Sequence, residues 1–237
     1  VDENYWDGPT PPFYGDFRLS FVFGAKELDW SGSHRGTNKF MFDKSVGAFR
    51  AGVADSLDWD SENRGAYSAA FGYNGIASGD STFIAGAYNE AETAGAAVFG
   101  ELNWIYEGDE GSSSKPPSGY VGLASTIAGG RYNEVYNGQL SGILSGASNY
   151  VDYSRSSAIA SGEYNWIEGD DNTSIISAFI GSGMDNYIHM SDGSSIVSGG
   201  DNIIGGASFM SFIGAGMDNL IGTNEDPEIA DEIDELL

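Results

Sequence analysis

One short phrase recurs along the chain from about residue 66 to residue 222. It reads serine, apolar residues, glycine, two variable residues, asparagine, and apolar residues again. Its clearest glycine-to-asparagine copies are residues 146–149, 162–165, 183–186, 199–202 and 216–219. A short repeat is typical of a solenoid, in which each coil buries its apolar side only against its neighbours. The repeat therefore predicts a stack of coils and argues against an ordinary globular enzyme.

The spacing of the repeat glycines predicts the length of each coil. Gly86 and Gly100 are 14 residues apart, whereas Gly146 and Gly162 are 16 residues apart and the last step is 17 residues. Two longer steps contain insertions, which in solenoids form loops on one side and mark contact surfaces. These insertions are residues 107–118 and 168–173.

Each coil offers two short apolar segments, such as residues 157–162 and 164–167. Segments of this length are unstable alone, so we expect parallel strands that pair from coil to coil in an all-β, parallel β-roll or β-solenoid. The alternation of residue types also predicts which branched side chains point inward. These are Ile127, Ile143, Ile159, Ile176, Ile196 and Ile213.

An asparagine recurs at one predicted corner of the coils. Stacked asparagines can form a ladder in which each amide bonds to the copies above and below. We therefore expect a structural role for them. They are Asn89, Asn103, Asn133, Asn149, Asn165, Asn186, Asn202 and Asn219.

Both ends of the chain depart from the repeat. Residues 1–64 are predicted to form an aromatic-rich N-terminal arm and a β-hairpin cap, with the hairpin over residues 38–52. Residues 65–222 form the solenoid, with short coils over 65–103 and longer coils with a corner asparagine over 119–222. After Pro227, apolar residues at helical spacing predict a short acidic helix within the tail, residues 223–237.

The chain carries 35 acidic and 10 basic residues, a formal net charge of -25. Such a charge repels nucleic acid and anionic membrane surfaces, so neither is an expected partner. There is no cysteine and no apolar run of about 20 residues that could cross a bilayer. The first residue is Val1, from which we expect a removed leader and an extracellular protein.

The first coils resemble a known family. Residues 65–79, GAYSAAFGYNGIASG, resemble the head repeats of YadA-like trimeric autotransporter adhesins, and residues 38–52 look like the segment that precedes such repeats in bacterial surface and phage tail-fibre proteins. The good match covers residues 38–103. The resemblance implies a left-handed parallel β-roll, usually trimeric, on a cell surface or a virion. Because the later coils are longer than the head pattern, we expect the coil shape to change near residue 104.

Catalytic residues are not expected. There is no cysteine nucleophile. His189 lies next to Ser191 and Asp192, but neighbours in sequence rarely form a triad, and His34 lies in a polar turn. Two histidines without regular spacing do not indicate a zinc site. Acidic clusters in turns suit calcium better than glycan cleavage, so no cofactor is expected, with calcium as the one candidate. The candidate calcium ligands are Asp55, Asp58, Asp60, Asp109, Glu110, Asp170 and Asp171.

Three tryptophans, Trp6, Trp104 and Trp166, are candidate contact residues for a sugar or a partner subunit. We therefore expect a non-enzymatic structural or adhesive protein of the cell surface or a virion fibre, with a glycan or a protein as partner. One alternative is a self-assembling subunit of an extracellular filament, docked head-to-tail through its N-terminal arm. The chain is expected to bind itself in either case, as a homotrimer in the adhesin or as a head-to-tail polymer in the filament. Another alternative is a phage tail-fibre component that binds or cleaves glycans.

Overall fold

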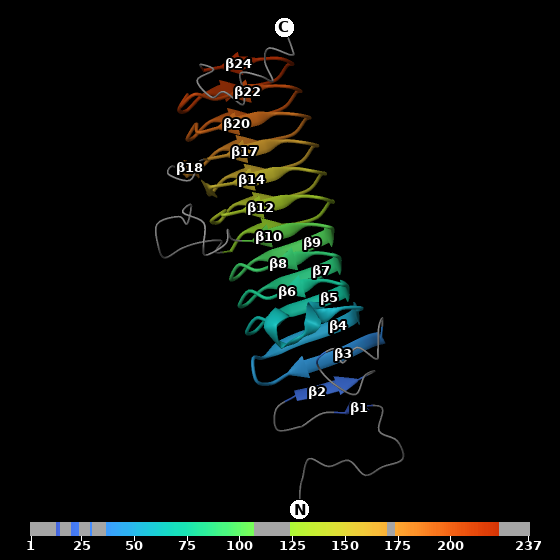
Figure 1. The fold of residues 1–237 in the computed structure, drawn as a ribbon. Coiled ribbons are helices and arrows are strands. Elements are labelled where there is room, and N and C mark those ends of the chain that lie inside the picture. The colour runs from blue at the N-terminus through green and yellow to red at the C-terminus, as the bar shows by residue number, and fades with distance from the viewer. Residues whose placement is uncertain are drawn as a thin grey trace, which may run out of the picture.

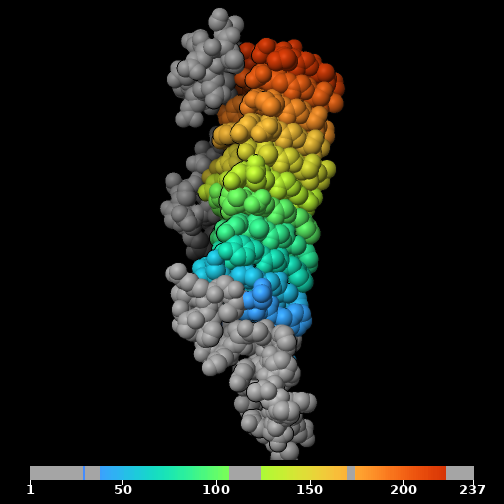
Figure 2. Space-filling view, turned by 90° about the vertical axis from the view of Figure 1, so that its right-hand side faces the viewer, coloured from blue at the N-terminus to red at the C-terminus, as the bar shows by residue number. Residues whose placement is uncertain are grey.

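The computed structural model describes the backbone of residues 13–14 and 20–23, together with residues 29, 37–106, 124–169 and 174–222. These residues form a rod of stacked coils (Figure 1). The coils follow one another in chain order along the rod (Figure 2). Predictions for the N-terminal arm, the insertion at residues 107–118 and the C-terminal helix lie outside the described residues.

Two long sheets run along the rod. Sheet A consists, in spatial order, of β1 (Phe13–Tyr14), β2 (Ser20–Phe23), β3 (Thr37–Asp43), β4 (Ala48–Ala54), β5 (Ala69–Tyr73), β7 (Phe83–Ala87), β9 (Ala97–Glu101), β11 (Thr126–Ile127), β13 (Gly142–Ile143), β16 (Ala158–Ile159), β19 (Phe179–Ile180), β21 (Ser195–Ile196) and β23 (Phe212–Ile213). Sheet B consists of β6 (Ile76–Ala77), β8 (Glu90–Ala91), β10 (Trp104–Tyr106), β12 (Glu134–Tyr136), β14 (Tyr150–Asp152), β17 (Trp166–Glu168), β20 (Tyr187–His189), β22 (Ile203–Ile204) and β24 (Leu220–Ile221).

All strand pairs from β4 onward are parallel, whereas β1 to β4 pair antiparallel. A small third sheet joins β15 (Ser154–Arg155) to β18 (Ile175–Ile176). The described helical turns are η1 (Leu57–Trp59) and η2 (Ser61–Asn63), and no described helix has the length and hydropathy that a membrane crossing requires. The prediction of an all-β parallel solenoid, here of about ten turns, is confirmed.

The core lies between the inner faces of sheets A and B, because alternation along each strand sends one branched residue inward per coil. In sheet A these residues include Ile84, Val98, Ile127, Ile143, Ile159, Ile180 and Ile196, and in sheet B they include Ile105, Val135, Val151, Ile167, Ile188 and Ile204. Each is at most 1% exposed, so every coil contributes to one continuous core.

One predicted core residue, Ile176, is wrong. Ile176 is 44% exposed on β18, and Ile180 instead pairs with Ile159 in the inner register of sheet A. The error arises because residues 174–177 read Ser-Ile-Ile-Ser and imitate the repeat next to the insertion. The true serine position is held by Ala178, whose backbone N–H donates to Ser157 Oγ at 3.1 Å.

The eight predicted asparagines form a continuous ladder along one corner. The backbone N–H of each later asparagine donates to the Oδ1 of the copy in the preceding coil, as Asn149 does to Asn133 at 3.1 Å. The Asn149 Nδ2 also donates to the Gly162 carbonyl at 3.0 Å. Gly146 shares this corner at a φ of 110°, and a Cβ there would lie 2.1 Å from the Gly162 oxygen. The glycine–asparagine phrase is therefore a corner motif.

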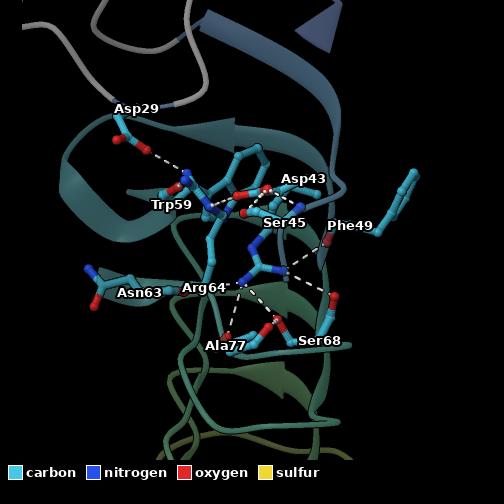
Figure 3. Close-up of polar contacts among 11 residues, drawn as sticks. Asp29, Asp43, Ser45, Phe49, Trp59, Asn63, Arg64, Ser68 and Ala77 are labelled. Atoms are coloured by element: carbon cyan, nitrogen blue, oxygen red, sulfur yellow. Dashed lines mark hydrogen bonds and ion pairs between the residues drawn. The ribbon is translucent and has the colours of Figure 1, made fainter. Parts of the chain in front are cut away.

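The N-terminal end of the core is closed by a buried arginine, whose bonding partners Asn63, Ser68 and Ala77 are labelled in Figure 3. Arg50 is fully buried and occupies the inner position of sheet A, in register with Ala70 of the next coil. Its guanidinium donates to the carbonyls of Asn63 (3.1 Å) and Ala77 (3.0 Å) and to Ser68 Oγ (3.0 Å). Burial and a neighbouring arginine lower the pKa of Arg50 to about 10. The cation thus binds backbone carbonyls where the aliphatic stack ends.

Arg64 closes the other sheet in the same way. It bridges to Ala77 in sheet B, and its guanidinium pairs with Asp43 at 2.9 Å and with Asp29 at 2.6 Å. It also donates to the carbonyl of Trp59 at 2.8 Å. Both aliphatic columns therefore end in an arginine, and both arginines contact the antiparallel hairpin β3–β4: Arg50 lies on β4, and Arg64 pairs with Asp43 of β3.

Candidate functional site

The outer faces of the two long sheets have opposite chemistry. The two residues that flank each inner residue of sheet A from β4 onward are Phe49, Ala51, Ala69, Phe71, Phe83, Ala85, Ala97, Phe99, Thr126, Ala128, Gly142, Leu144, Ala158, Ala160, Phe179, Gly181, Ser195, Val197, Phe212 and Gly214, and the exposed Glu101 at the end of β9 lies outside this set. Every one of these residues is uncharged, although the chain as a whole has a net charge of -25. This surface is named the apolar face.

Sheet B instead presents aromatic rings and carboxylates. Its outward residues from β8 to β20 are Glu90, Glu92, Trp104, Tyr106, Glu134, Tyr136, Tyr150, Asp152, Trp166, Glu168, Tyr187 and His189. This surface is named the aromatic–acidic face. Neighbouring rings touch, with centroids 5.3 Å apart for Tyr150 and Trp166 and 6.3 Å apart for Trp166 and Tyr187.

Tyrosine hydroxyls hold several carboxylates on the aromatic–acidic face. The hydroxyl of Tyr187 donates to Glu168 Oε2 at 2.5 Å, and that of Tyr150 donates to Asp152 Oδ2 at 3.1 Å. Tyr106 donates to Glu134 in a short bond. These bonds fix the rings and the acids relative to each other, so the face is preorganised for contact.

Burial changes the protonation of this face. Asp152 is 5% exposed, and burial raises its pKa to about 7 although its bonds to Tyr153 and Tyr150 act in the opposite direction. Burial and the nearby charges of Glu92 and Asp58 raise the pKa of Glu90 to about 7. The pKa of Glu134 is also raised, mainly by burial. The face is therefore less negative near neutral pH than its composition implies.

A cavity of about 340 Å³ lies at the N-terminal end of this face. Outward residues of sheet B form its floor, residues of the adjoining corner form one side, and the loop around η1 forms another. The lining residues are Ser56, Asp58, Asn74, Ile76, Tyr88, Asn89, Glu90, Leu102 and Trp104. Its volume lies within the range of small-molecule sites.

The loop that walls the cavity is fixed to the first coil. The backbone N–H of Asp55 donates to Asn74 Oδ1 at 3.0 Å, and Tyr73 donates to Asp55 Oδ2 at 2.8 Å. Trp59, which is buried, donates from Nε1 to the Gly75 carbonyl at 2.9 Å. Because these bonds bracket Ser56 and Asp58, the wall is rigid.

The structure places some of the predicted site residues together. Trp104 and Trp166 both lie on the aromatic–acidic face, three coils apart, and Trp104 also lines the cavity. His189 lies on the same face, stacked on Tyr187 at 5.6 Å. Trp6 and His34 lie outside the described residues.

The predicted calcium ligands are divided between the cap and the insertions. Asp55 bonds to Tyr73 and Asn74, Asp58 accepts from Ser56 Oγ at 2.6 Å, and Asp60 follows η1. Within residues 37–106, 124–169 and 174–222, no cluster of three or more histidine or acidic side chains is arranged to hold a metal ion. The other four, Asp109, Glu110, Asp170 and Asp171, lie outside the described residues. Calcium binding stays a prediction.

Sequence reasoning missed the acids with the most altered protonation, Glu90 and Asp152. Each stands beside a buried inner residue, in the segments Glu90-Ala-Glu92 and Tyr150-Val-Asp152. Their alternation showed that they face outward. The burial that raises their pKa comes from neighbouring coils, which local sequence does not reveal.

No protein-family model, curated protein or solved structure matches this chain.

Proposed function

We propose that this protein is a non-enzymatic structural and adhesive rod, displayed outside the cell on a surface fibre or adhesin, that presents its aromatic–acidic face to a glycan or protein. The observation that carries the proposal is the run of contacting aromatic rings that Tyr150, Trp166 and Tyr187 form on three consecutive coils of that face. Amphipathic rings with a polar tip are enriched at interfaces, because one part is apolar and the other stays hydrated. A stack of coils holds the rings at fixed spacing.

Binding of the purified full chain to glycan arrays and to intact cells tests this proposal. Trp166→Ala should weaken binding at least about 10-fold, the loss typical of a hot-spot aromatic. Phe83→Ala is the matched control, since Phe83 is 40% and Trp166 is 45% exposed but Phe83 lies on the apolar face. Equal effects of the two variants would contradict the proposed face. Sugar release from the bound glycan would support the glycan-cleaving alternative.

The apolar face favours a second candidate function, the self-assembling subunit. Phe71 and Phe83 stand next to Ala69 and Ala85, and the Phe71 and Phe83 rings lie 5.5 Å apart, so ridges alternate with hollows. Large exposed apolar patches mark interaction sites. Two copies of so acidic a chain approach with least repulsion through their uncharged faces, so the occupant proposed here is a second copy.

Light scattering of the full chain tests self-assembly. Phe83→Lys should disrupt a complex formed through the apolar face, and Tyr150→Lys on the opposite face should leave it intact. Deletion of residues 1–16 separately tests head-to-tail docking through the N-terminal arm. A wild-type chain that is monomeric at every concentration would remove this candidate function.

A further inference from the structure

We infer that the cavity bounded by Asp58, Glu90 and Trp104 binds a protonated organic amine, as carried by a lysine side chain or an amino sugar. The inference deepens the proposed contact function by naming the ligand chemistry for one end of the aromatic–acidic face.

The cavity combines two kinds of wall. The outward column of sheet B supplies Ile76, Glu90 and Trp104 in consecutive coils, so a carboxylate lies between an aliphatic and an indole side chain. Tyr88 and Leu102 add ring and aliphatic surface from the corner. An ammonium group on a carbon chain needs a carboxylate for its charge and apolar or aromatic surface for its stem.

The charges in and around the cavity favour a cation. Asp58 lines the wall of the cavity and Glu90 lines its floor. Glu92, two residues after Glu90, is the next outward residue of the same chain segment. Among the described residues, no basic side chain bonds to or pairs with Glu90. Its raised pKa reflects burial first and then these acidic neighbours, Glu92 and Asp58. A bound ammonium would supply the missing counter-charge.

The lining residues and the volume of the cavity argue against other ligands. A divalent calcium ion takes six to eight oxygen ligands. Among the lining residues the carboxylates are Asp58 and Glu90, and the amide oxygens of Asn74 and Asn89 already accept hydrogen bonds from the backbone N–H groups of Asp55 and Asn103. Anions are disfavoured by Asp58 and Glu90. The volume of about 340 Å³ accommodates one sugar ring or one lysine side chain.

Calorimetric titration of the full chain at pH 8 tests the inference with two ligand pairs. Nα-acetyl-lysinamide is compared with its Nε-acetylated form, and glucosamine with N-acetylglucosamine. We expect the amines to bind and the acetylated forms not to bind. The pair with the tighter amine distinguishes a peptide source from a sugar source.

Glu90→Gln should weaken amine binding at least about 10-fold, because truncating one partner of a desolvated charge pair is costly. Glu134→Gln is the control, since it removes the same charge from the same outward column outside the cavity. For the wild type, affinity should also fall at least about 10-fold between pH 8 and pH 5.5, as Glu90 gains a proton. Circular dichroism confirms that both variants are folded.

Two results would overturn the inference: equal binding of the acetylated and free ligands, or equal losses for Glu90→Gln and Glu134→Gln. The proposed contact face is judged separately by Trp166, which lies outside the cavity. Adhesion that depends on Trp166 but not on Glu90 would therefore leave the face in place and remove the amine site.

Discussion

The short coils of residues 65–106 and the long coils of residues 124–222 satisfy the stacked backbone in different ways. In the short coils, sheet A strands such as β7 and β9 pair over five residues. In the long coils, sheet A strands such as β13 and β16 pair over only two. The long coils therefore have shorter strands in sheet A, whereas sheet B pairs over three residues in β12–β14 and over two in β6–β8.

Side-chain amides compensate in the long coils. Asn149 Nδ2 donates to Asn133 Oδ1 at 3.0 Å, whereas Asn103 Nδ2 in the short coils donates to the carbonyls of Phe99 and Gly130. The amide-to-amide ladder begins only at Asn133. In the long coils, hydrogen bonds between buried asparagine side chains thus replace part of the backbone pairing of sheet A. The stability of these coils therefore depends on an asparagine at each corner position.

The largest expected loss of stability comes from replacing the corner glycine, in the short coils and in the long coils alike. It tests whether both kinds of coil use the same corner geometry. Gly86→Ala and Gly146→Ala each place a Cβ about 2 Å from the next coil's glycine oxygen at a positive φ. Each should destabilise the protein by more than about 4 kcal/mol, because coils must separate to relieve the clash. Urea denaturation followed by circular dichroism measures this. Gly129→Ala is the control, since no atom lies within 4 Å of its added Cβ.

The next effect should be confined to the short-coil end. Arg50→Leu removes a cation that satisfies the carbonyls of Asn63 and Ala77, so we expect a loss of about 3 kcal/mol. Hydrogen exchange should accelerate in β5 and β6 and stay slow in β13 and β14. Arg131→Leu, which removes a guanidinium 5.1 Å from the Tyr132 ring, should have a small effect. Uniform loosening along the rod would contradict an end-cap role.

Asparagine replacement should separate the two regions directly. Asn149→Ala breaks bonds to Asn133 and Gly162 and removes the acceptor for the Asn165 N–H, which should cost about 2–4 kcal/mol. Asn89→Ala breaks bonds to the carbonyls of Ala85 and Gly100 and removes the acceptor for the Asn103 N–H. It should cost less than Asn149→Ala, because no neighbouring asparagine amide loses its acceptor and the sheet A strands beside it pair over five residues. Midpoints of urea unfolding provide the comparison. A larger loss of stability for Asn89→Ala than for Asn149→Ala would contradict the claim that asparagine side chains contribute more in the long coils.

The smallest effect concerns pH and should appear in both regions, through Glu90 and Asp152. Their pKa values are raised to about 7 in the folded protein from 4.5 and 3.8. Their stabilising contribution is therefore complete below about pH 4 and is lost as pH rises through 7. Thermal unfolding should show a more stable protein at pH 5.5 than at pH 8, by about 1 kcal/mol per group after solvent screening. Asp152→Asn should flatten this dependence.

The stack of coils could be predicted from the sequence because each coil repeats the same short pattern of residue types. Serine, glycine and asparagine mark the turns, and alternation marks inner residues such as Ile143 and Ile159. Ile176 was misplaced because the insertion before it adds a second copy of the serine–isoleucine pattern. Inner residues cannot be predicted from the repeat spacing where an insertion interrupts the repeat.

The cap and the cavity could not be predicted in the same way. Arg50 occupies an inner position that the pattern reserves for an aliphatic residue, and only its contacts with Ser68 and Ala77 explain its burial. The cavity depends on how the loop carrying Asp58 lies over Glu90 and Trp104, from three separate segments. Both features arise from contacts between coils and the cap, which have no period.

The parallel register has a consequence for how such a protein can change in evolution. Neighbouring long coils pair through equivalent residues, as Tyr150 does with Glu134 and Trp166, so copying one long coil disturbs neither end. A duplication of 16 residues would lengthen the rod by about 4.8 Å, the spacing between paired strands. Both outer faces would continue in line through the new coil. The length of the rod is therefore set by the number of coils and can change in steps of one coil.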